Sequence, residues 1–303
     1  MTQSKLMTLA EAISRFVSDG SSIALGTAQE TLIPFAAGHE IIRQCKRDLT
    51  LIGPISDILF DQMIGAGCVK KVRAAWVGNV ITGSGYNFRQ AIESGELEME
   101  DHSNLTLAMG LRAGALGVPF LPTYTALGSD LRLTNHHLKT VTCPFTGRIL
   151  TAVAAINPDV AIIHVQRADI YGNAHAWGNL GVTREACQAA GRVILTCEEI
   201  VSSQLIQSDP NRVIVPGLRV AAVVHAPWGA HPSPVPGFYN RDHEVFQAYQ
   251  EASKTPDAFA EWLAGWIDGV QRAENYPEFI GVEKRNELAL KVHAPSRSVD
   301  YGY

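Results

Sequence analysis

Short apolar runs alternate along the chain with longer stretches in which apolar residues recur every three or four positions. The short runs predict β-strands and the periodic stretches predict amphipathic helices. Because the runs are almost continuously apolar, we expect strands that are covered on both faces. The predicted strands span residues 22–25, 48–52, 69–77, 159–166, 192–196 and 220–225. This alternation predicts an α/β fold, an open and mainly parallel sheet with helices on both faces.

Capping and stop signals set the bounds of the helices between these strands. Thr8 and Glu11 have the spacing of a capping box, which opens the first helix. Ser103 or Asn104 can cap an apolar helix over residues 105–116. Further helices are predicted near residues 34–45, 56–64, 87–94, 183–190, 242–253 and 255–270.

The length favours one domain across residues 1–303, since open α/β sheets often reach this size. A hydrophobic content of 46% is ample for one large core. Residues 120–148 lack a clear period and predict an irregular excursion with one or two short strands. The polar stretch from about residue 283 predicts a loosely held tail.

Charge and hydropathy exclude two classes of partner. The net charge is −5, and the lysines and arginines are scattered, so we expect no nucleic-acid partner. No run approaches the roughly eighteen apolar residues of a membrane span, and the first five residues lack the apolar core of a signal peptide. We therefore expect a cytoplasmic protein with no membrane partner.

Several potentially reactive side chains are explained more simply by a structural role than by catalysis or metal binding. The five cysteines are odd in number and lack C-x-x-C spacing, which argues against a disulfide framework or a zinc knuckle. His136 and His137 are adjacent and predict a solvated loop, so we expect no metal site. Glu96, Glu98 and Glu100 would share one strand face, which predicts a solvated face, although a catalytic carboxylate there stays open.

Four polar turns follow predicted strands, and the carboxyl ends of parallel strands are where α/β enzymes place their sites. The turns are Gly26-Thr27-Ala28-Gln29, residues 79–88 with Gly83-Ser84-Gly85, residues 167–177 with Gly172-Asn173, and residues 228–233 with Gly229 and His231. Four such turns predict one composite site.

Taken alone, each turn has two interpretations. The glycines beside Ser84 would let backbone amides approach an anion, but the Rossmann and Walker spacings are absent, so an ordinary tight turn is an equal alternative. His231 could donate a hydrogen bond to a bound carboxylate or thioester oxygen, or it could only hold its turn. No G-x-S-x-G elbow is present, which argues against a serine hydrolase.

Together with several blocks in the same order, these turns resemble the alpha subunit of family I coenzyme A transferases, of the glutaconate CoA-transferase type. The resemblance covers nearly the whole chain. Its blocks include Met99-Glu100-Asp101, residues 117–122, residues 159–164, Thr196-Cys197-Glu198-Glu199-Ile200, residues 226–233 and Ser253-Lys254-Thr255.

The resemblance implies a hetero-oligomer of alpha-beta pairs, in which the beta subunit carries a glutamate that becomes a glutamyl-CoA thioester. This chain would then hold no catalytic residue. The substrates would be an acyl-CoA donor and a small carboxylic acid, dicarboxylic and glutaconate-like, and coenzyme A would enter as a thioester substrate with no tightly bound cofactor. The scheme is covalent catalysis with ping-pong kinetics.

The same resemblance carries over ten binding residues on this chain. They are Gly26, Thr27, Ser84, Gly85, Ser103, Asn104, Gly172, Asn173, Gly229 and His231. Two positions depart from the family pattern: Gly-Gly-Phe is Gly26-Thr27-Ala28 here, and Ser-Gln at the helix cap is Ser103-Asn104. Both departures would alter the acid pocket, so the substrate need not be glutaconate.

Two further hypotheses stay open. An acyl-CoA decarboxylase or hydrolase could be built on the same two-subunit scaffold, although a ring-opening relative uses a glutamate near the cap where Asn104 stands. A ligand-sensing domain is the alternative from another class. Such regulators carry a DNA-binding helix-turn-helix, whereas the first twenty residues here predict only one capped helix.

Overall fold

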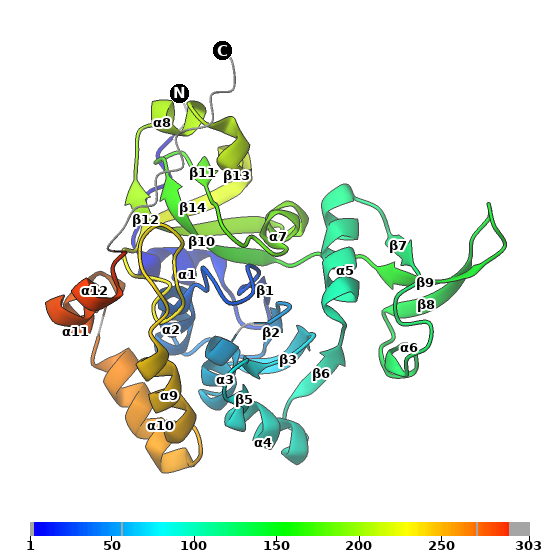
Figure 1. The fold of residues 1–303 in the computed structure, drawn as a ribbon, viewed down its shortest axis with the longest axis horizontal. Coiled ribbons are helices and arrows are strands. Elements are labelled where there is room, and N and C mark those ends of the chain that lie inside the picture. Colours follow the sequence, from blue (N-terminus) through cyan, green and yellow to red (C-terminus); the bar gives the residue numbers. More distant parts are fainter. Residues whose placement is uncertain (1–2, 56, 271, 291–303) are drawn as a thin grey trace.

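A twisted, mainly parallel sheet forms the centre of the computed structural model, which describes residues 3–55, 57–270 and 272–290 (Figure 1). The parallel strands lie in the order β14-β12-β10-β1-β2-β3-β6. Their bounds are β1 Ser22–Ala24, β2 Leu49–Ile52, β3 Val69–Ala74, β6 Glu98–Asp101, β10 Val160–Ala168, β12 Arg192–Ile200 and β14 Val220–His225. The order reverses between β1 and β10, which makes this boundary the topological switch point of the sheet. Two short strands, β11 (Ala174–His175) and β13 (Val213–Val215), extend the sheet from β10 in antiparallel pairing.

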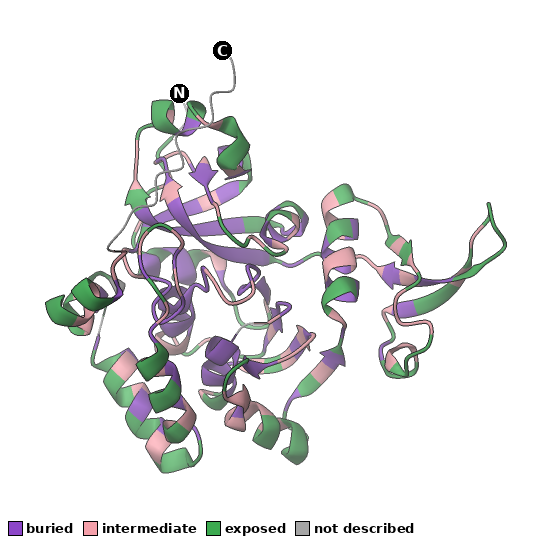
Figure 2. Cartoon of the chain, viewed as in Figure 1, coloured by how far each residue is buried: buried purple, intermediate pink, exposed green. Residues whose placement is uncertain are grey.

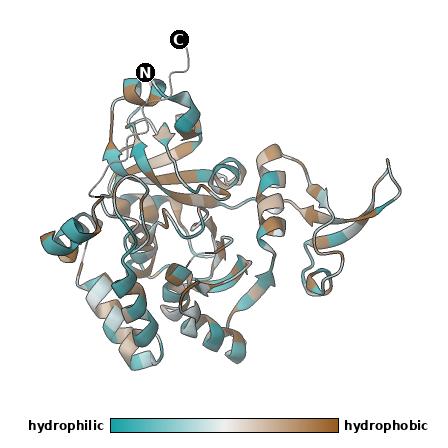
Figure 3. Ribbon diagram, in the orientation of Figure 1, coloured by the Kyte–Doolittle hydropathy of each residue, from teal (hydrophilic) through white to brown (hydrophobic). Residues whose placement is uncertain are grey.

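The two faces of the sheet are covered by different helices. Ile23 and Leu25 of the first strand segment enter a core with α1 (Leu9–Phe16), α2 (Phe35–Arg43) and α3 (Asp57–Gly65). Ala24 points to the other face, which packs against α5 (Asn104–Leu116) and α7 (Thr183–Ala189). Buried residues concentrate in these strands and inner helix faces (Figure 2), and Figure 3 shows hydrophobic residues along the central strands. The predicted fold class is therefore confirmed.

The predicted helix caps form as expected. The Thr8 hydroxyl accepts a hydrogen bond from the Glu11 amide, and the Glu11 carboxylate accepts one from the Thr8 amide. Ser103 caps α5 through the Thr106 amide at 3.1 Å. The remaining helices are α4 Tyr86–Ser94, α6 Leu131–Thr134, α8 Ser203–Gln207, α9 His243–Ala252, α10 Pro256–Leu263, α11 Tyr276–Ile280 and α12 Val282–Leu288. No helix in the described ranges is both long and apolar enough to cross a membrane.

Residues 120–154 form an arm that projects from the main body (Figure 1). The expected irregular excursion is more regular than the sequence suggests: β7 (Phe120–Thr123), β9 (Ile149–Ala154) and β8 (Leu138–Thr142) form an antiparallel sheet in that order. Only some positions are buried, among them Leu138 and Val153, so the apolar alternation is weak. Partners β7 and β9 are also distant in sequence, which hides their pairing from local patterns.

The first described residues of the predicted loose tail are helical and anchored, contrary to the expectation. Val282–Leu288 forms α12, and Leu288 is buried against Tyr239 and Val235. The Asn240 amide donates to the Leu288 carbonyl at 2.9 Å, so this helix is tied to the loop that precedes α9. Residues 291–303, on which the rest of this prediction falls, lie outside the described residues.

Candidate functional site

The turn after β1 lies at the switch point and is held by the segment that precedes α7. Gly26 has a positive φ of 65°, and Thr27 is buried. The Thr27 hydroxyl lies 3.0 Å from the Thr183 hydroxyl, and the Thr27 carbonyl accepts the Val182 amide at 2.9 Å. A Cβ at Gly181 would overlap the Thr27 carbonyl, so glycine is required for this approach. The turn is therefore fixed in place.

His231 holds the turn after β14 from inside the protein. Its Nδ1 lies 2.9 Å from the Tyr276 hydroxyl and its Nε2 lies 3.0 Å from Asp242 Oδ2. The residue is only 1% exposed. Burial would raise the pKa of Asp242, but the His231 hydrogen bond and the Val245 amide hold it below its usual value. Because both ring nitrogens are engaged, the geometry favours the alternative in which His231 holds its turn over direct contact with a ligand.

A buried carboxylate at the end of β12 supports the same turn. Glu198 accepts hydrogen bonds from the Tyr239 hydroxyl at 2.7 Å and from the Trp228 amide at 2.8 Å, and His164 Nε2 lies 2.8 Å from Oε1. Trp228 has a positive φ of 63° and stacks on Tyr239 with ring centroids 4.2 Å apart. Such backbone strain persists only where surrounding contacts hold it. Glu198 lies in a block that carries the family resemblance, but the sequence did not predict its contacts with His164, Trp228 and Tyr239.

The Ser84-Gly85 turn belongs to a small hairpin formed by β4 (Gly78–Asn79) and β5 (Gly83–Ser84). Ser84 Oγ accepts the Trp76 indole N–H at 3.3 Å. A side chain at Gly85 would overlap the buried carboxylate of Asp61, so glycine is needed where α4 begins. Asp61 accepts the Phe88 amide at 2.7 Å. The space beside this turn is thus filled by the carboxyl group of Asp61, a residue of the protein itself.

Arg241 connects three of the strand-end loops. Its Nη2 donates to Asp57 Oδ2 at 2.6 Å, and its Nη1 lies 3.5 Å from Glu30 Oε2. Burial raises the pKa of Asp57 to about 6, although Arg241 and Asn79 oppose this shift. The sequence predictions did not include Asp57 or Arg241. Asp57 lies five residues after the predicted strand 48–52 and Arg241 eight residues after the predicted turn 228–233, so no local sequence signal joins them.

Ser103 and Asn104 lie beside a second charged cluster. Ser103 is partly buried as the cap, and Asn104 is exposed at the first position of α5. In the preceding strand, Glu100 is buried, with Lys71 Nζ at 3.1 Å and Arg73 Nε at 3.0 Å. Burial would raise the pKa of Glu100, but its His102 hydrogen bond and the Arg73 charge lower it to about 2.

The cluster around Glu100 corrects two expectations about polar runs. Glu96 and Glu98 are exposed as expected, but Glu100 on the same predicted face is buried beneath the arm. His136 is exposed, whereas His137 is half-buried with its Nε2 3.5 Å from Glu100 Oε2. The arm supplies these contacts from distant sequence, which is why the local pattern did not reveal them. Within the described ranges, no group of three or more His, Cys, Asp or Glu side chains is arranged to hold a metal ion.

Gly172 and Asn173 do not join the other turns. Strand β10 continues seven residues beyond Ala161, the partner of Ala24, which places its end about 20 Å farther along the sheet. There, Asn173 Nδ2 donates to Asp169 and its Oδ1 accepts the Gly217 amide at 2.9 Å. The composite site of four turns is therefore corrected to three turns plus the segment 177–182. Asn179 of that segment contacts the β1 turn through Gln29.

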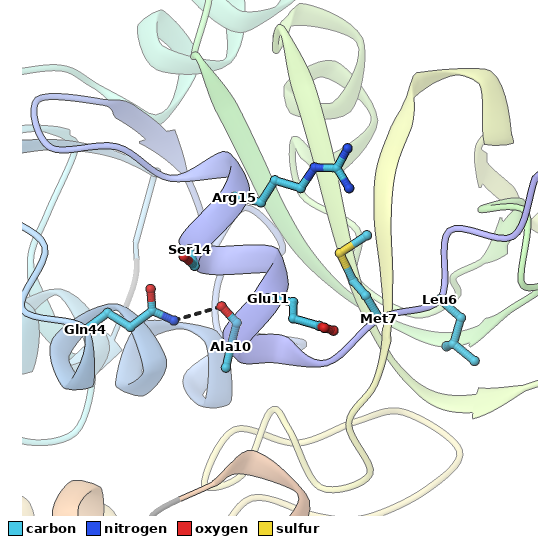
Figure 4. Close-up of a pocket in the computed structure, with 7 residues that line it drawn as sticks. All are labelled: Leu6, Met7, Ala10, Glu11, Ser14, Arg15 and Gln44. Carbon is cyan, nitrogen blue, oxygen red and sulfur yellow. Dashed lines mark hydrogen bonds between the residues drawn. The ribbon is translucent and has the colours of Figure 1, made fainter.

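A groove of about 690 Å³ along α1 contains none of the predicted site residues (Figure 4). It is lined by Leu6, Met7, Ala10, Glu11, Ser14, Arg15 and Gln44. Gln44 Nε2 donates to the Ala10 carbonyl at 2.9 Å, and Glu11 is engaged in the capping box. This groove offers no convergent reactive groups, so the strand-end turns remain the candidate site.

The fold and the switch-point turns are those of an α/β enzyme. The chain belongs to the coenzyme A transferase family, whose model matches residues 6–226. One subunit of 3-oxoadipate CoA-transferase from Pseudomonas knackmussii is 43% identical over 270 residues, which cover 88% of this chain and 95% of the relative. One subunit of glutaconate CoA-transferase from Acidaminococcus fermentans is 36% identical over 304 residues, 95% of each chain. The family resemblance found in the sequence is confirmed.

Solved structures agree with this assignment. Glutaconate coenzyme A-transferase from Acidaminococcus fermentans has a TM-score of 0.90 at 35% identity, with 98% of this chain and 99% of that chain covered. The decarboxylase AibA/AibB has a TM-score of 0.76 at 30% identity, with 87% and 100% covered. The chain is thus a CoA-transferase alpha-type subunit. Both transferase relatives are named as single subunits of a larger enzyme, which implies a partner subunit here.

Proposed function

We propose that this chain is the alpha half of a CoA-transferase that moves CoA from an acyl-CoA to a small dicarboxylic acid. One observation supports a nucleophile on the partner subunit: the buried carboxyl groups at the strand-end turns of this chain already have hydrogen-bond or ion-pair partners. Glu198 has three partners, Asp61 accepts the Phe88 amide, and Asp57 pairs with Arg241. A nucleophilic carboxylate has to be free to attack, so the partner subunit supplies it.

The reaction then has two half-reactions. The partner's glutamate carboxylate attacks the acyl carbonyl and displaces CoA as a thiolate, which leaves a mixed anhydride. The thiolate then attacks the glutamyl carbonyl, which releases the donor acid as a carboxylate and leaves a glutamyl-CoA thioester. A second acid takes CoA from that thioester and restores the glutamate carboxylate. This chain contributes shape and hydrogen-bond donors around the acid, where fixed dipoles stabilise the oxyanions that form during acyl transfer.

The acid is assigned to the dicarboxylic class. The two relatives described above are named for 3-oxoadipate and glutaconate, both of which are dicarboxylic acids. We place the acid against Gly26, Thr27, Ser84, Gly85, Ser103, Asn104 and Gly229. His231 serves as support for its turn, and Gly172 and Asn173 serve as an anchor for the distal end of β10. CoA enters as a thioester substrate, with no tightly bound cofactor.

Trapping the thioester tests this function. The chain is purified with its co-expressed partner, incubated with an acyl-CoA, and treated with borohydride or hydroxylamine before peptide mass spectrometry. We expect modification of one glutamate on the partner. Glu30 is the internal comparison, because its side chain is 43% exposed at the same turns. Modification of Glu30 instead would place the nucleophile on this chain and contradict the proposal.

A decarboxylase or hydrolase is the second candidate, favoured by the structural match to the decarboxylase AibA/AibB. The same trapping experiment separates the two. Consumption of the CoA ester without an acceptor acid and without a modified glutamate would support the alternative. Transfer of CoA that requires an acceptor acid would support the transferase.

A further inference from the structure

One buried ion pair joins loops that lie far apart in the sequence. Asp57 is the first residue of α3, is 1% exposed and has a positive φ of 50°. Its Oδ2 accepts Arg241 Nη2 at 2.6 Å. The Arg241 guanidinium also lies 3.9 Å from the ring centroid of Phe246, which fixes the plane of the side chain.

The second oxygen of Asp57 reaches the Ser84 hairpin. Asp57 Oδ1 accepts Asn79 Nδ2 at 2.7 Å. In turn, Asn79 Oδ1 accepts the amides of Ile81 and Thr82 at 2.8 and 3.3 Å. The Asn79 side chain therefore shapes the hairpin turn, and Asp57 holds that side chain in its orientation.

The arginine reaches the two other turns. Arg241 Nη1 faces Glu30, which lies in the loop after β1. The next residue, Asp242, binds His231 Nε2 and caps α9 through the Val245 amide. The Asp57–Arg241 pair thus stands between the β1 loop, the Ser84 hairpin and the His231 turn.

We infer that Asp57 and Arg241 are positioning residues that hold these three turns in one geometry for the acid, an inference that rests on the proposed function. Stability alone is a weak reason for such a pair, because desolvation of two charges offsets much of their attraction. The pair instead fixes the positions of the loops relative to one another. Small displacements of groups around a substrate greatly lower the reaction rate.

The test uses the complex with its partner, and compares wild type with Asp57→Asn, Arg241→Gln and the double variant. Arg241→Lys is the milder variant, which keeps the charge. Arg112→Gln is the matched control, since Arg112 forms a more exposed ion pair, with Glu185 at 2.9 Å between α5 and α7. Rates are normalised to the fraction of sites that form the thioester, which removes the effect of misfolded protein.

We expect the KM for the acid to rise about 10- to 100-fold in both single variants. The double variant should lose no more than either single one, because the two residues act as one unit. Arg241→Lys should recover part of the loss, and the control should match wild type. An unchanged KM with a loss that tracks only the folded fraction would overturn the inference.

Hydrogen exchange of the same complexes gives a readout that does not depend on the activity. We expect amide exchange at Ile81, Thr82 and residues 229–231 to quicken about tenfold in Asp57→Asn, with β10 unchanged as the reference. Unchanged exchange at these amides would refute the positioning role. A wild-type complex that forms no thioester, yet shows this loosening in the variant, would refute the transferase proposal alone.

Discussion

His164 Nε2 lies 2.8 Å from Glu198 Oε1, and both side chains are sealed from solvent within the parallel sheet. They stand on neighbouring strands, where His164 is paired with Thr196 two residues before Glu198. His164 Nδ1 lies 2.9 Å from the Thr196 hydroxyl, so the ring is held at both nitrogens. Through Glu198 this arrangement reaches the Trp228 amide and fixes the turn after β14.

Replacement of Glu198 should therefore lower stability. In Glu198→Gln the amide would place a donor among the three donors that surround the carboxylate, and leave at least one of them unpaired. We expect a loss of about 1–3 kcal/mol in the free energy of unfolding, measured by urea denaturation. Glu199→Gln is the control, because Glu199 forms only a surface pair with Arg167 and should lose less than about 1 kcal/mol. Equal losses of stability in the two variants would contradict the role of Glu198 in holding the turn after β14.

Substitution of His231 separates support of the turn from contact with a ligand. His231→Gln should leave Tyr276 or Asp242 without its partner and cost about 1–3 kcal/mol of stability. Any rise in the KM for the acid should accompany this loss of stability, because His231 acts on the acid only through the turn that it holds. Kinetics with a thermal melt of each complex test this. A large rise in KM without loss of stability would restore His231 as a binding residue.

Glu100 gives the protein a specific sensitivity to acid. Its pKa is lowered from 4.5 to about 2 in the fold, so its contribution to stability is present above pH 4.5. The contribution is lost as the pH falls from 4.5 towards 2, because the unfolded chain then binds the proton more tightly. After a discount for partial screening by solvent, we expect about 1–2 kcal/mol.

Unfolding free energies at pH 6 and pH 3 measure this effect. Wild type should lose more stability between these values than Glu100→Gln, which has no carboxylate to protonate. Glu98→Gln is the matched control, because its side chain is 63% exposed on the same strand and its loss should equal that of wild type. A wild-type pH dependence in Glu100→Gln would rule out this assignment.

Local sequence patterns identified the parallel sheet and its caps, because both depend on neighbouring residues. Buried strands such as Val160–Ala168 are continuous apolar runs, and the Thr8–Glu11 box has a fixed spacing. The turn residues at the switch point were also found, since polar residues that follow a buried strand mark its carboxyl end.

The contacts that shape the site could not be found in this way. Asp57 meets Arg241 across 184 positions and Glu198 meets Tyr239 across 41, so no local pattern records either pair. Gly172 and Asn173 were misplaced for a related reason: the sequence does not show that β10 outruns β1 by several residues. The arm was predicted as an excursion with one or two short strands, and its three-stranded sheet was not recognised because that sheet is only partly buried.

The exposed apolar surface predicts how the chain behaves without its partner. Phe145 and Leu133 on the arm are 93% and 76% exposed, and Leu218 is 84% exposed. Permanent hetero-complexes cover such surface, because their interfaces resemble a protein core cut in half. We expect the isolated chain to self-associate in sedimentation velocity, and the co-expressed pair to give a discrete complex. Phe145→Ser with Leu133→Ser should reduce self-association of the isolated chain, whereas Lys139→Ser on the same arm should not. A sharp monomer boundary for the unmodified isolated chain at high concentration would contradict an obligate partner.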